Sequence, residues 1–225
     1  MKIAVLGTGG VGRAIAGRFA ELGHDITIGT RDPQSTRART ENDGMGNPPY
    51  SVWAGEHDGV RLANYPEAAA GADVVVNATS GSASLEVLAA AGADNLSGKV
   101  LLDIANPLDF TAGMPPTLFV KDTDSLGEQI QRAFPAARVV KSLNTLNANL
   151  MVRPDLLPEG SSVFVSGDDA DAKALVTTLL TELGHTDVID LGDLSTARGT
   201  EMLLPVWLRL MGALGTPMFN FKIVR

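Results

Sequence analysis

A glycine-rich turn follows directly after the first apolar segment of the chain, Lys2–Leu6. The turn reads Gly7-Thr8-Gly9-Gly10-Val11-Gly12, which matches G-x-G-x-x-G, and it leads into an amphipathic segment that ends at Glu21. Gly7 suits a tight turn, Gly9 lets a pyrophosphate approach the backbone, and Gly12 lets helix and strand pack closely. The helix N-terminus offers free N–H groups and a positive dipole end to phosphates. The turn therefore predicts dinucleotide binding; a plain strand–helix turn is the alternative.

Short apolar segments alternate with alanine-rich segments of helical period along the chain. The predicted strands are Lys2–Leu6, Asp25–Thr30, Val60–Ala63, Asp73–Ala78, Val100–Ile104, Arg138–Leu143, Ser162–Val165 and Asp187–Leu191. The predicted helices are Val11–Glu21, Tyr65–Ala70, Ser84–Ala91, Ser125–Phe134 and Asp169–Leu183. Several strands are apolar on both faces, as in a parallel sheet covered by helices on both sides. The order predicts an α/β fold with a doubly wound, Rossmann-type parallel sheet.

Three stretches break this alternation. Residues 41–59 and 105–124 contain glycine, proline and asparagine, and we expect them to form long loops, which are functional or are tolerated surface insertions. After Gly192 the chain becomes apolar and mainly helical. We therefore expect a dinucleotide-binding domain over residues 1–192 and a small C-terminal helical appendage over residues 193–225. This apolar appendage is predicted to cover the cleft, to form a homodimer contact, or both.

Composition excludes several classes of function. The net charge of −8 is the opposite of what a nucleic-acid-binding protein needs. There is no cysteine, so disulfides, thiolate metal sites and a cysteine nucleophile are excluded, and the three histidines lack metal-ligand spacing. Neither a signal peptide nor a membrane span is predicted, because the first apolar run is short and segment 202–214 contains Pro205 and Arg209. The working expectation is a cytoplasmic protein without a metal.

The end of the second predicted strand indicates which dinucleotide is bound. An NAD site usually has Asp or Glu there, to hold the ribose 2′-hydroxyl. This chain has Thr30 followed by Arg31, and a hydroxyl with a guanidinium suits a 2′-phosphate. Asp32-Pro33 is typical of a helix N-cap followed by a first-turn proline. The sequence thus favours NADP over NAD; Arg37 is a second candidate, or a solvated surface charge.

Small polar residues follow three other strands, at the edge of the sheet where ligands of parallel sheets bind. They are Asn77, Ala78 and Thr79 after the fourth strand, Ala105 and Asn106 after the fifth, and Asn144-Thr145 after the sixth. We expect them to line the ribose and nicotinamide of the cofactor. Capping of the following helix by Thr79 or Ser80 is an equally good structural interpretation.

The chain resembles the coenzyme F420-dependent NADP reductases, Rossmann proteins that pass a hydride between a deazaflavin and NADP. The matching segments are MKIAVLGTGGVG, GHDITIGTRDP, VVVNAT, VLLDIANP, VVKSLNT and the apolar tail, in the same order over essentially the whole chain. The resemblance implies that Gly7, Thr8, Gly9, Gly10 and Val11 bind the cofactor. It also implies that Thr30, where serine is common, and Arg31 hold the 2′-phosphate. No deazaflavin contacts are matched residue by residue.

The resemblance implies an NADP-dependent oxidoreductase with coenzyme F420 as second substrate. Ring-to-ring hydride transfer needs proximity and orientation more than an acid–base group. Accordingly, no Ser–His–Asp or Tyr–Lys set stands out, and no catalytic residue is assigned. Lys141 is the first candidate for a proton donor; the alternative is a lysine near a strand end that reaches solvent or a carboxylate. The same two interpretations apply to Glu201 and Arg198. The alternatives are an NADPH-dependent reductase of a small imine, ketone or other acceptor, and a non-catalytic NADP-binding redox sensor.

Overall fold

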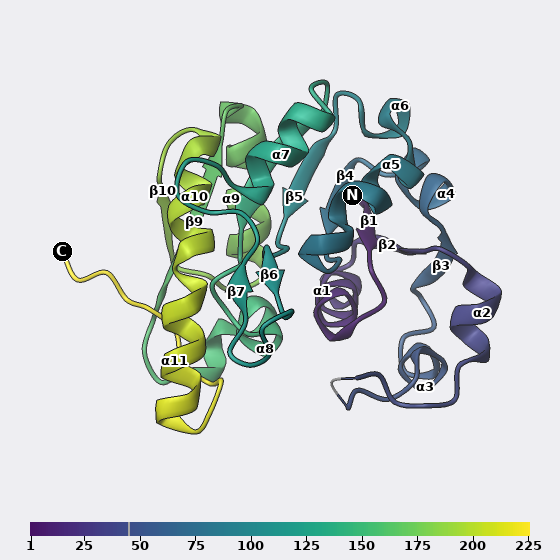
Figure 1. Cartoon of the computed structure of the whole chain (residues 1–225). Helices are drawn as coiled ribbons and strands as arrows, with labels where there is room; N and C mark the ends of the chain where they lie inside the picture. Colours follow the sequence, from purple (N-terminus) through teal and green to yellow (C-terminus); the bar gives the residue numbers. More distant parts are fainter. Residues whose placement is uncertain (45) are drawn as a thin grey trace.

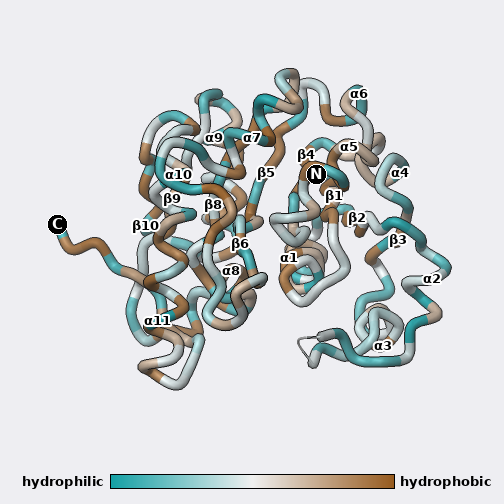
Figure 2. The backbone as a smooth tube through the Cα atoms, in the orientation of Figure 1, coloured by the Kyte–Doolittle hydropathy of each residue, from teal (hydrophilic) through white to brown (hydrophobic). Residues whose placement is uncertain are grey.

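Alternate side chains of the central strands pack into two separate hydrophobic layers. Ile3 and Val5 of the first strand lie in one layer, and Ala4 and Leu6 lie in the other. The triple-valine strand, Val74–Asn77, divides in the same way, and all of its residues are buried. Successive side chains of a strand point to opposite faces, so strands that are apolar throughout need helices on both sides. Figure 2 shows these hydrophobic segments in the middle of the molecule.

The computed structural model describes residues 1–44 and 46–225. The strands are β1 Lys2–Leu6, β2 Asp25–Thr30, β3 Arg61–Asn64, β4 Val74–Asn77, β5 Val100–Asp103, β6 Leu108–Asp109, β7 Thr117–Leu118, β8 Arg138–Ser142, β9 Ser162–Gly167 and β10 Asp187–Asp190. The α-helices are α1 Gly10–Glu21, α2 Pro33–Ala38, α3 Tyr50–Gly55, α4 Tyr65–Ala70, α5 Ser84–Ala91, α6 Ala93–Leu96, α7 Leu126–Ala133, α8 Ala148–Val152, α9 Ala170–Glu182, α10 Ala197–Met202 and α11 Leu204–Leu214. Short 3-10 turns are η1 Gly81–Ala83, η2 Pro154–Leu156 and η3 Leu194–Thr196.

Within the described residues, eight strands form one sheet in the order β10-β9-β8-β5-β4-β1-β2-β3 (Figure 1). The strand order reverses beside β1, which pairs in parallel with both β2 and β4. Ligands of such sheets bind outside the carboxyl ends of the strands at this switch point. One face is covered by α1, α8 and α9, and the other by α4, α5, α7 and α10. The expected doubly wound, Rossmann-type fold is confirmed.

One end of the sheet departs from the parallel arrangement that the sequence predicts. β9 runs antiparallel to β8, and β10 runs parallel to β9. A parallel connection needs a crossover of a dozen or more residues, usually a long helix. The helix after β8 is α8, which has five residues, whereas α9, with thirteen, provides the crossover from β9 to β10. The β8–β9 connection thus lacks a long crossover helix, and β9 returns antiparallel along β8.

Both expected loops contain regular structure. The stretch 41–59, of which residue 45 lies outside the described residues, contains α3. Tyr50 is buried and Trp53 stacks on His57 with ring centroids 4.2 Å apart, so packing stabilises a helix that has no side-chain cap. The stretch 105–124 contains the two-residue strands β6 and β7, which pair as an antiparallel hairpin. Prediction of these two stretches as loops was therefore wrong in part.

The C-terminal segment is helical only as far as Leu214. Gly215 follows in the left-handed region, with φ of 66°, and ends α11. The last residues run beside the start of β9, where the N–H of Ser162 donates to the carbonyl of Phe221. Leu204 and Trp207 of α11 are buried, but Val206 is 50% exposed. One side of α11 is thus exposed in the single chain, and the predicted covering of the cleft or homodimer contact stays a prediction.

Gly12→Ala is expected to lower the stability of the fold. A Cβ at this position would lie 2.2 Å from the carbonyl oxygen of Gly7, which is backbone and cannot rotate away. Overpacking of this kind costs about 1–3 kcal/mol. In a chain of this size, each kcal/mol lowers the unfolding midpoint by about 2–4 °C, which thermal unfolding followed by circular dichroism would detect.

Gly9→Ala is the matched control, because a Cβ at Gly9 meets no atom within 4 Å. Its backbone φ of −73° suits any L-residue, so its unfolding midpoint should stay at the wild-type value. Equal midpoints for the two variants would contradict the packing role of Gly12.

Candidate functional site

The glycine-rich turn lies at the switch point and leaves the start of α1 open. The N–H of Gly7 donates to the carbonyl of Gly29 in β2, and a Cβ on Gly7 would lie 2.5 Å from the carbonyl oxygen of Ala78 after β4. The turn is thus in close backbone contact with the neighbouring strand ends. Gly9 is the N-cap of α1 and provides no side-chain cap, and the first turn holds no acidic residue. These N–H groups and the open space over Gly9 fit a pyrophosphate.

The pair at the end of β2 occupies two different environments. Thr30 is buried, and its Oγ1 lies 2.8 Å from Oγ1 of Thr36 in α2. Arg31 is exposed and pairs with Glu86 of α5 at 3.0 Å. Both side chains of this ion pair are about three-quarters exposed, so it stabilises the fold by about 0–1 kcal/mol at most and can give way to a phosphate dianion.

The segment after Arg31 begins a helix, as the sequence predicts. Asp32 is the N-cap of α2 and accepts hydrogen bonds from the N–H groups of Gln34 and Ser35, with Pro33 in the first turn. The hydroxyl and the N–H of Ser35 hold the pKa of Asp32 below its ordinary value. The Asp32 carboxylate is therefore directed to its own helix terminus. This leaves Arg31 as the charged group that directly follows β2.

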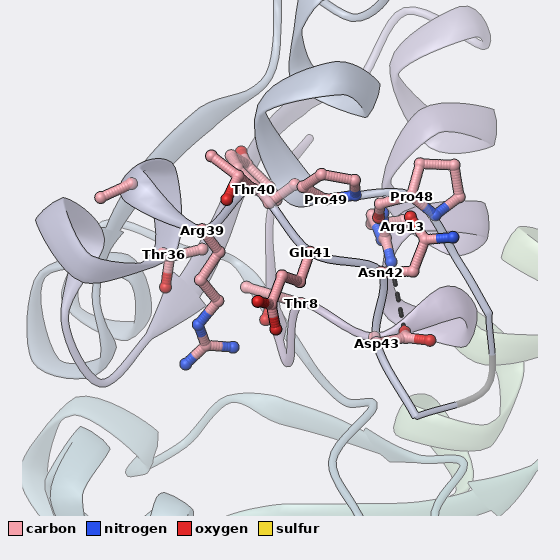
Figure 3. A pocket seen from close by; sticks show the side chains of 13 residues that line it. Thr8, Arg13, Thr36, Arg39, Thr40, Glu41, Asn42, Asp43, Pro48 and Pro49 are labelled. Carbon is pink, nitrogen blue, oxygen red and sulfur yellow. Dashed lines mark hydrogen bonds and ion pairs between the residues drawn. The ribbon is translucent and has the colours of Figure 1, made fainter.

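A pocket of about 490 Å³ opens beside the glycine-rich turn (Figure 3). It is lined by Thr8, Gly9, Arg13, Thr36, Ala38, Arg39, Thr40, Glu41, Asn42, Asp43, Pro48, Pro49 and Tyr50. Its lining includes Arg39 rather than Arg37, which is exposed on α2. Figure 3 shows the side chains of Arg39 and Glu41 extending on the same side of the pocket. Sequence reasoning missed Arg39, because α2 ends at Ala38 and the turn that follows decides which arginine faces the cleft.

Arg13 shapes the far wall of this pocket and was also missed. Its side chain is nearly buried; Nη1 donates to the carbonyl of Pro48 at 2.6 Å, and Nη2 donates to the carboxylate of Asp43 at 3.4 Å. Asp43 in turn accepts from the N–H and side-chain amide of Asn47. Arg13 thus anchors the loop before α3 to α1. The pattern G-x-G-x-x-G-R carries no local signal for this long-range contact.

The polar residues after β4 bind one another. The Nδ2 of Asn77 donates to Oδ1 of Asp103 at 2.8 Å and to Oγ of Ser84 at 3.0 Å, and its Oδ1 accepts from the Thr79 hydroxyl at 2.6 Å. Asn77 is fully buried, so its side chain links strands. At this strand end the backbone of Ala78 contacts the glycine-rich turn. Cofactor contact by Asn77, Ala78 and Thr79 therefore stays a prediction.

The residues after β5 and β8 form a reciprocal amide pair. Asn106 donates from Nδ2 to the carbonyl of Asn144 at 2.8 Å, and Asn144 donates from Nδ2 to Oδ1 of Asn106 at 3.0 Å. Asn144 also donates to the carbonyl of Thr200 in α10. Two strand ends and the C-terminal segment therefore meet at these side chains. Ala105, the residue before the pair, is buried, and its contact with a cofactor also stays a prediction.

Lys141 contacts two carboxylates. This is the structural alternative that the sequence analysis gave beside the role of proton donor. Its side chain is fully buried, with Nζ 2.8 Å from both Asp103 and Glu201. Burial alone would lower the pKa of Lys141, but the charges of Asp103 and Glu201 and their hydrogen bonds outweigh it and raise the pKa above its ordinary value. The ammonium therefore stays protonated. Arg198 also pairs with a carboxylate, that of Glu128 in α7, but its side chain is 35% exposed.

A second, more apolar groove of about 740 Å³ lies beneath the β6–β7 hairpin. It is lined by Gly81, Ser82, Leu85, Leu108, Asp109, Phe110, Thr111, Phe119, Leu126 and Gln129. Among the described residues, no cluster of His, Cys, Asp or Glu could hold a metal ion. In the same part of the chain, no helix has the length and apolar character needed to cross a membrane.

The mainly parallel sheet with a glycine-rich turn at its switch point defines a dinucleotide-binding protein with a Rossmann-type fold. A family model described as "NADP oxidoreductase coenzyme F420-dependent" matches residues 2–107. The F420-dependent NADP reductase of Methanothermobacter thermautotrophicus is 30% identical over 215 residues, which cover 93% of this chain and 89% of that protein. The chain belongs to the family of F420-dependent NADP reductases and is an enzyme of the NADP-dependent oxidoreductase class.

Two further proteins are similar over nearly the whole chain. A crystal structure from Arthrobacter sp. FB24, of a protein provisionally named an F420-dependent NADP reductase, has 65% sequence identity, a TM-score of 0.97 and complete coverage of both chains. The metalloreductase STEAP3 of Rattus norvegicus is 27% identical over 92% of this chain. This chain spans only 38% of the length of STEAP3. The similarity to STEAP3 therefore concerns one part of a larger protein.

Arg31→Ala and Arg39→Ala are each expected to weaken binding of NADPH by about 10- to 100-fold while binding of NADH changes little. The reason is that a charge-assisted hydrogen bond to a phosphate contributes about 1.5–3 kcal/mol, and NADH lacks the 2′-phosphate. Titration of nicotinamide fluorescence would measure both dissociation constants.

Arg37→Ala is the comparison for these two variants, since Arg37 is an exposed residue of α2, lies between Arg31 and Arg39 in the sequence, and does not line the pocket that Arg39 lines. It should bind NADPH as the wild type does. Equal losses for NADPH and NADH in Arg31→Ala would refute the assignment of Arg31 to the 2′-phosphate.

Proposed function

We propose that this chain transfers a hydride between NADP(H) and coenzyme F420 by direct ring-to-ring transfer. The observation that carries the proposal is that the candidate proton-transfer groups at the carboxyl ends of β5 and β8 are bound by other protein groups. Lys141, the candidate proton donor, is buried between two carboxylates, and Asn106 and Asn144 are hydrogen-bonded to each other. The family membership supports F420 as the partner of NADP.

The residues of this chain would hold NADP along the switch point of the sheet. The N–H groups after Gly9 would bind the pyrophosphate, and the open space over Gly9 would allow its approach. Arg31 and Arg39 supply positive charge for the 2′-phosphate, next to the hydroxyls of Thr30 and Thr36. The nicotinamide would then lie toward the ends of β4 and β5, because the adenosine end would be held beside β2.

Catalysis would then rest on orientation. Bound NADPH supplies a hydride, and the conjugated deazaflavin ring delocalises the charge that develops on accepting it. What remains for the protein is to hold the two rings in contact and to exclude water, which is catalysis by proximity. The Asn106–Asn144 pair, which joins β5 and β8 to α10, lies where such support is needed.

Purified protein mixed with NADPH and oxidised F420 is expected to bleach the deazaflavin absorbance, and NADH is expected to be a much poorer donor. The control is Gly9→Ala, in which the added methyl fills the space for the pyrophosphate without touching the fold. This variant should bind NADPH weakly and bleach F420 slowly.

Tight NADPH binding without any bleaching would refute F420 as the acceptor. A screen of imines and ketones would then separate a small-molecule reductase from a redox sensor, which would turn over none of them.

We further propose that residues 1–192 are the cofactor-binding domain and that residues 193–225 form an appendage through which two chains associate. Val206 and Leu214 of α11 are 50% and 56% exposed, and Ile223 of the last segment is 47% exposed. Apolar side chains of this size gathered on one segment favour self-association. Light scattering after gel filtration should give twice the chain mass of 23.5 kDa.

The variant Val206→Glu should shift this mass toward the monomer without unfolding the chain, since the side chain is half exposed. A wild-type mass of one chain at micromolar concentration would contradict the proposed dimer.

A further inference from the structure

Three charged side chains form a buried cluster beneath the carboxyl edge of the sheet. Lys141 of β8 lies between Asp103 of β5 and Glu201 of α10, and the exposed fractions of the three side chains are 0%, 0% and 2%. The cluster thus joins the middle of the sheet to the C-terminal segment. We call Asp103, Lys141 and Glu201 the ionic cluster.

The negative charge in excess within the cluster is balanced by neutral donors. Glu201 accepts from the N–H groups of Leu126 and Gly127, at 2.8 and 3.1 Å, at the positive end of α7. Asp103 accepts from the side-chain amide of Asn77 at 2.8 Å. Every carboxylate oxygen of the cluster therefore has a donor.

Stability alone is a poor explanation for such a cluster. Burying charges costs desolvation free energy, and well-packed apolar side chains of similar volume often give equal or greater stability. A buried ionic cluster fixes geometry, because its hydrogen bonds have defined lengths and directions whereas apolar contacts do not. The function of the ionic cluster therefore depends on which segments of the chain it holds in place.

The cluster holds the segment that leads to the cleft. Lys141 donates from Nζ to the carbonyl of Ala105 at 2.5 Å, and Asp103 accepts from the N–H of Ala105 at 3.2 Å. Both polar groups of Ala105 are thereby attached to the cluster. The next residue is Asn106, which bonds to Asn144.

The same cluster reaches Asn144 from the other side. Asn144 donates to the carbonyl of Thr200, which directly precedes Glu201. A closed circuit therefore runs from Ala105 through the Asn106–Asn144 pair and Thr200 to Glu201, and returns through Lys141. A displacement of Glu201 would move both members of the amide pair.

We propose that Lys141, Asp103 and Glu201 are positioning residues, which set the Asn106–Asn144 pair at the nicotinamide end of the cleft for hydride transfer. Lys141 exchanges no proton with the substrate in this role. The inference rests on the proposed function for its catalytic consequence, but the mechanical coupling of Glu201 to Asn106 and Asn144 is measurable by itself.

A second ion pair between the same helices provides a matched control. Arg198 of α10 binds Glu128 of α7, one turn before Glu201, and the Arg198 side chain is 35% exposed. This pair also docks α10 on α7. It belongs to neither the ionic cluster nor the circuit through the amide pair, so its loss tests the effect of weaker docking alone.

The experiment compares Glu201→Gln and Asp103→Asn with Arg198→Met. Both amide variants keep Lys141 beside one carboxylate, so each leaves a balanced cluster in a folded chain. In Glu201→Gln and Asp103→Asn, we expect amide hydrogens of residues 104–107 and 143–146 to exchange faster than in the wild type. In Arg198→Met, the same amide hydrogens should exchange at the wild-type rate. A 1 Å misplacement in an active site can cost about 100-fold in rate.

The catalytic readout is the single-turnover rate of hydride transfer to F420 per molecule of bound NADPH, which does not depend on the folded fraction. We expect Glu201→Gln to lower this rate at least about 10-fold. Its NADPH dissociation constant and the shape of its pH–rate profile should stay unchanged. Arg198→Met should transfer at the wild-type rate.

Wild-type exchange in both amide variants would overturn the inference, as would an equal effect of Arg198→Met. A changed pH–rate profile would overturn the positioning role in favour of proton transfer. If the wild type does not reduce F420 at all, the proposed function fails, and the hydrogen-exchange comparison alone decides whether the cluster positions the amide pair.

Discussion

A lysine buried between two carboxylates joins parts of this chain that are far apart in sequence. Lys141, Asp103 and Glu201 come from two strands and a C-terminal helix. Removing one member of such a buried pair costs about 3–5 kcal/mol, because the remaining charge has no solvent to stabilise it. The helix α10, the start of α7 and the ends of β5 and β8 therefore keep one arrangement relative to each other. The carboxyl edge of the sheet depends on this arrangement for its shape.

The other half of that edge is shaped by steric contact rather than by charge. Gly7 and Gly12 let the turn after β1 approach Ala78 and the start of α1 more closely than any side chain would allow. The result is a helix N-terminus without a cap at the switch point of the sheet. The chain as a whole carries a net charge of −8, whereas the pocket beside this turn is lined by two arginines, Arg13 and Arg39, and by two carboxylates, Glu41 and Asp43. The formal charges of this lining cancel, in contrast to the negative average charge of the protein.

Most of the sheet and half of the candidate site could be predicted from local patterns. Strand Val74–Asn77 and the turn Gly7–Gly12 have one reasonable interpretation, because a wholly apolar strand needs two covered faces and the glycines need close contacts. The helix α3 could not be predicted, because Tyr50 and Trp53 are held by packing against the distant core cluster and against α1 near Gly17. Arg39 and Arg13 were missed for a related reason. Whether an arginine faces solvent or a pocket depends on the path of a loop rather than on the identity of its neighbours.

The sequence by itself determined the doubly wound fold, the position of the dinucleotide turn and the N-cap at Asp32, because each follows from periodicity or from contacts within a few residues. Only the tertiary structure decided the antiparallel direction of β9, the position of Arg39 rather than Arg37 in the pocket lining, and the two carboxylate partners of Lys141. These three depend on groups that are brought together across the sheet. Asp103 and Glu201 are 38 and 60 residues from Lys141, and a local pattern holds no information about such a meeting.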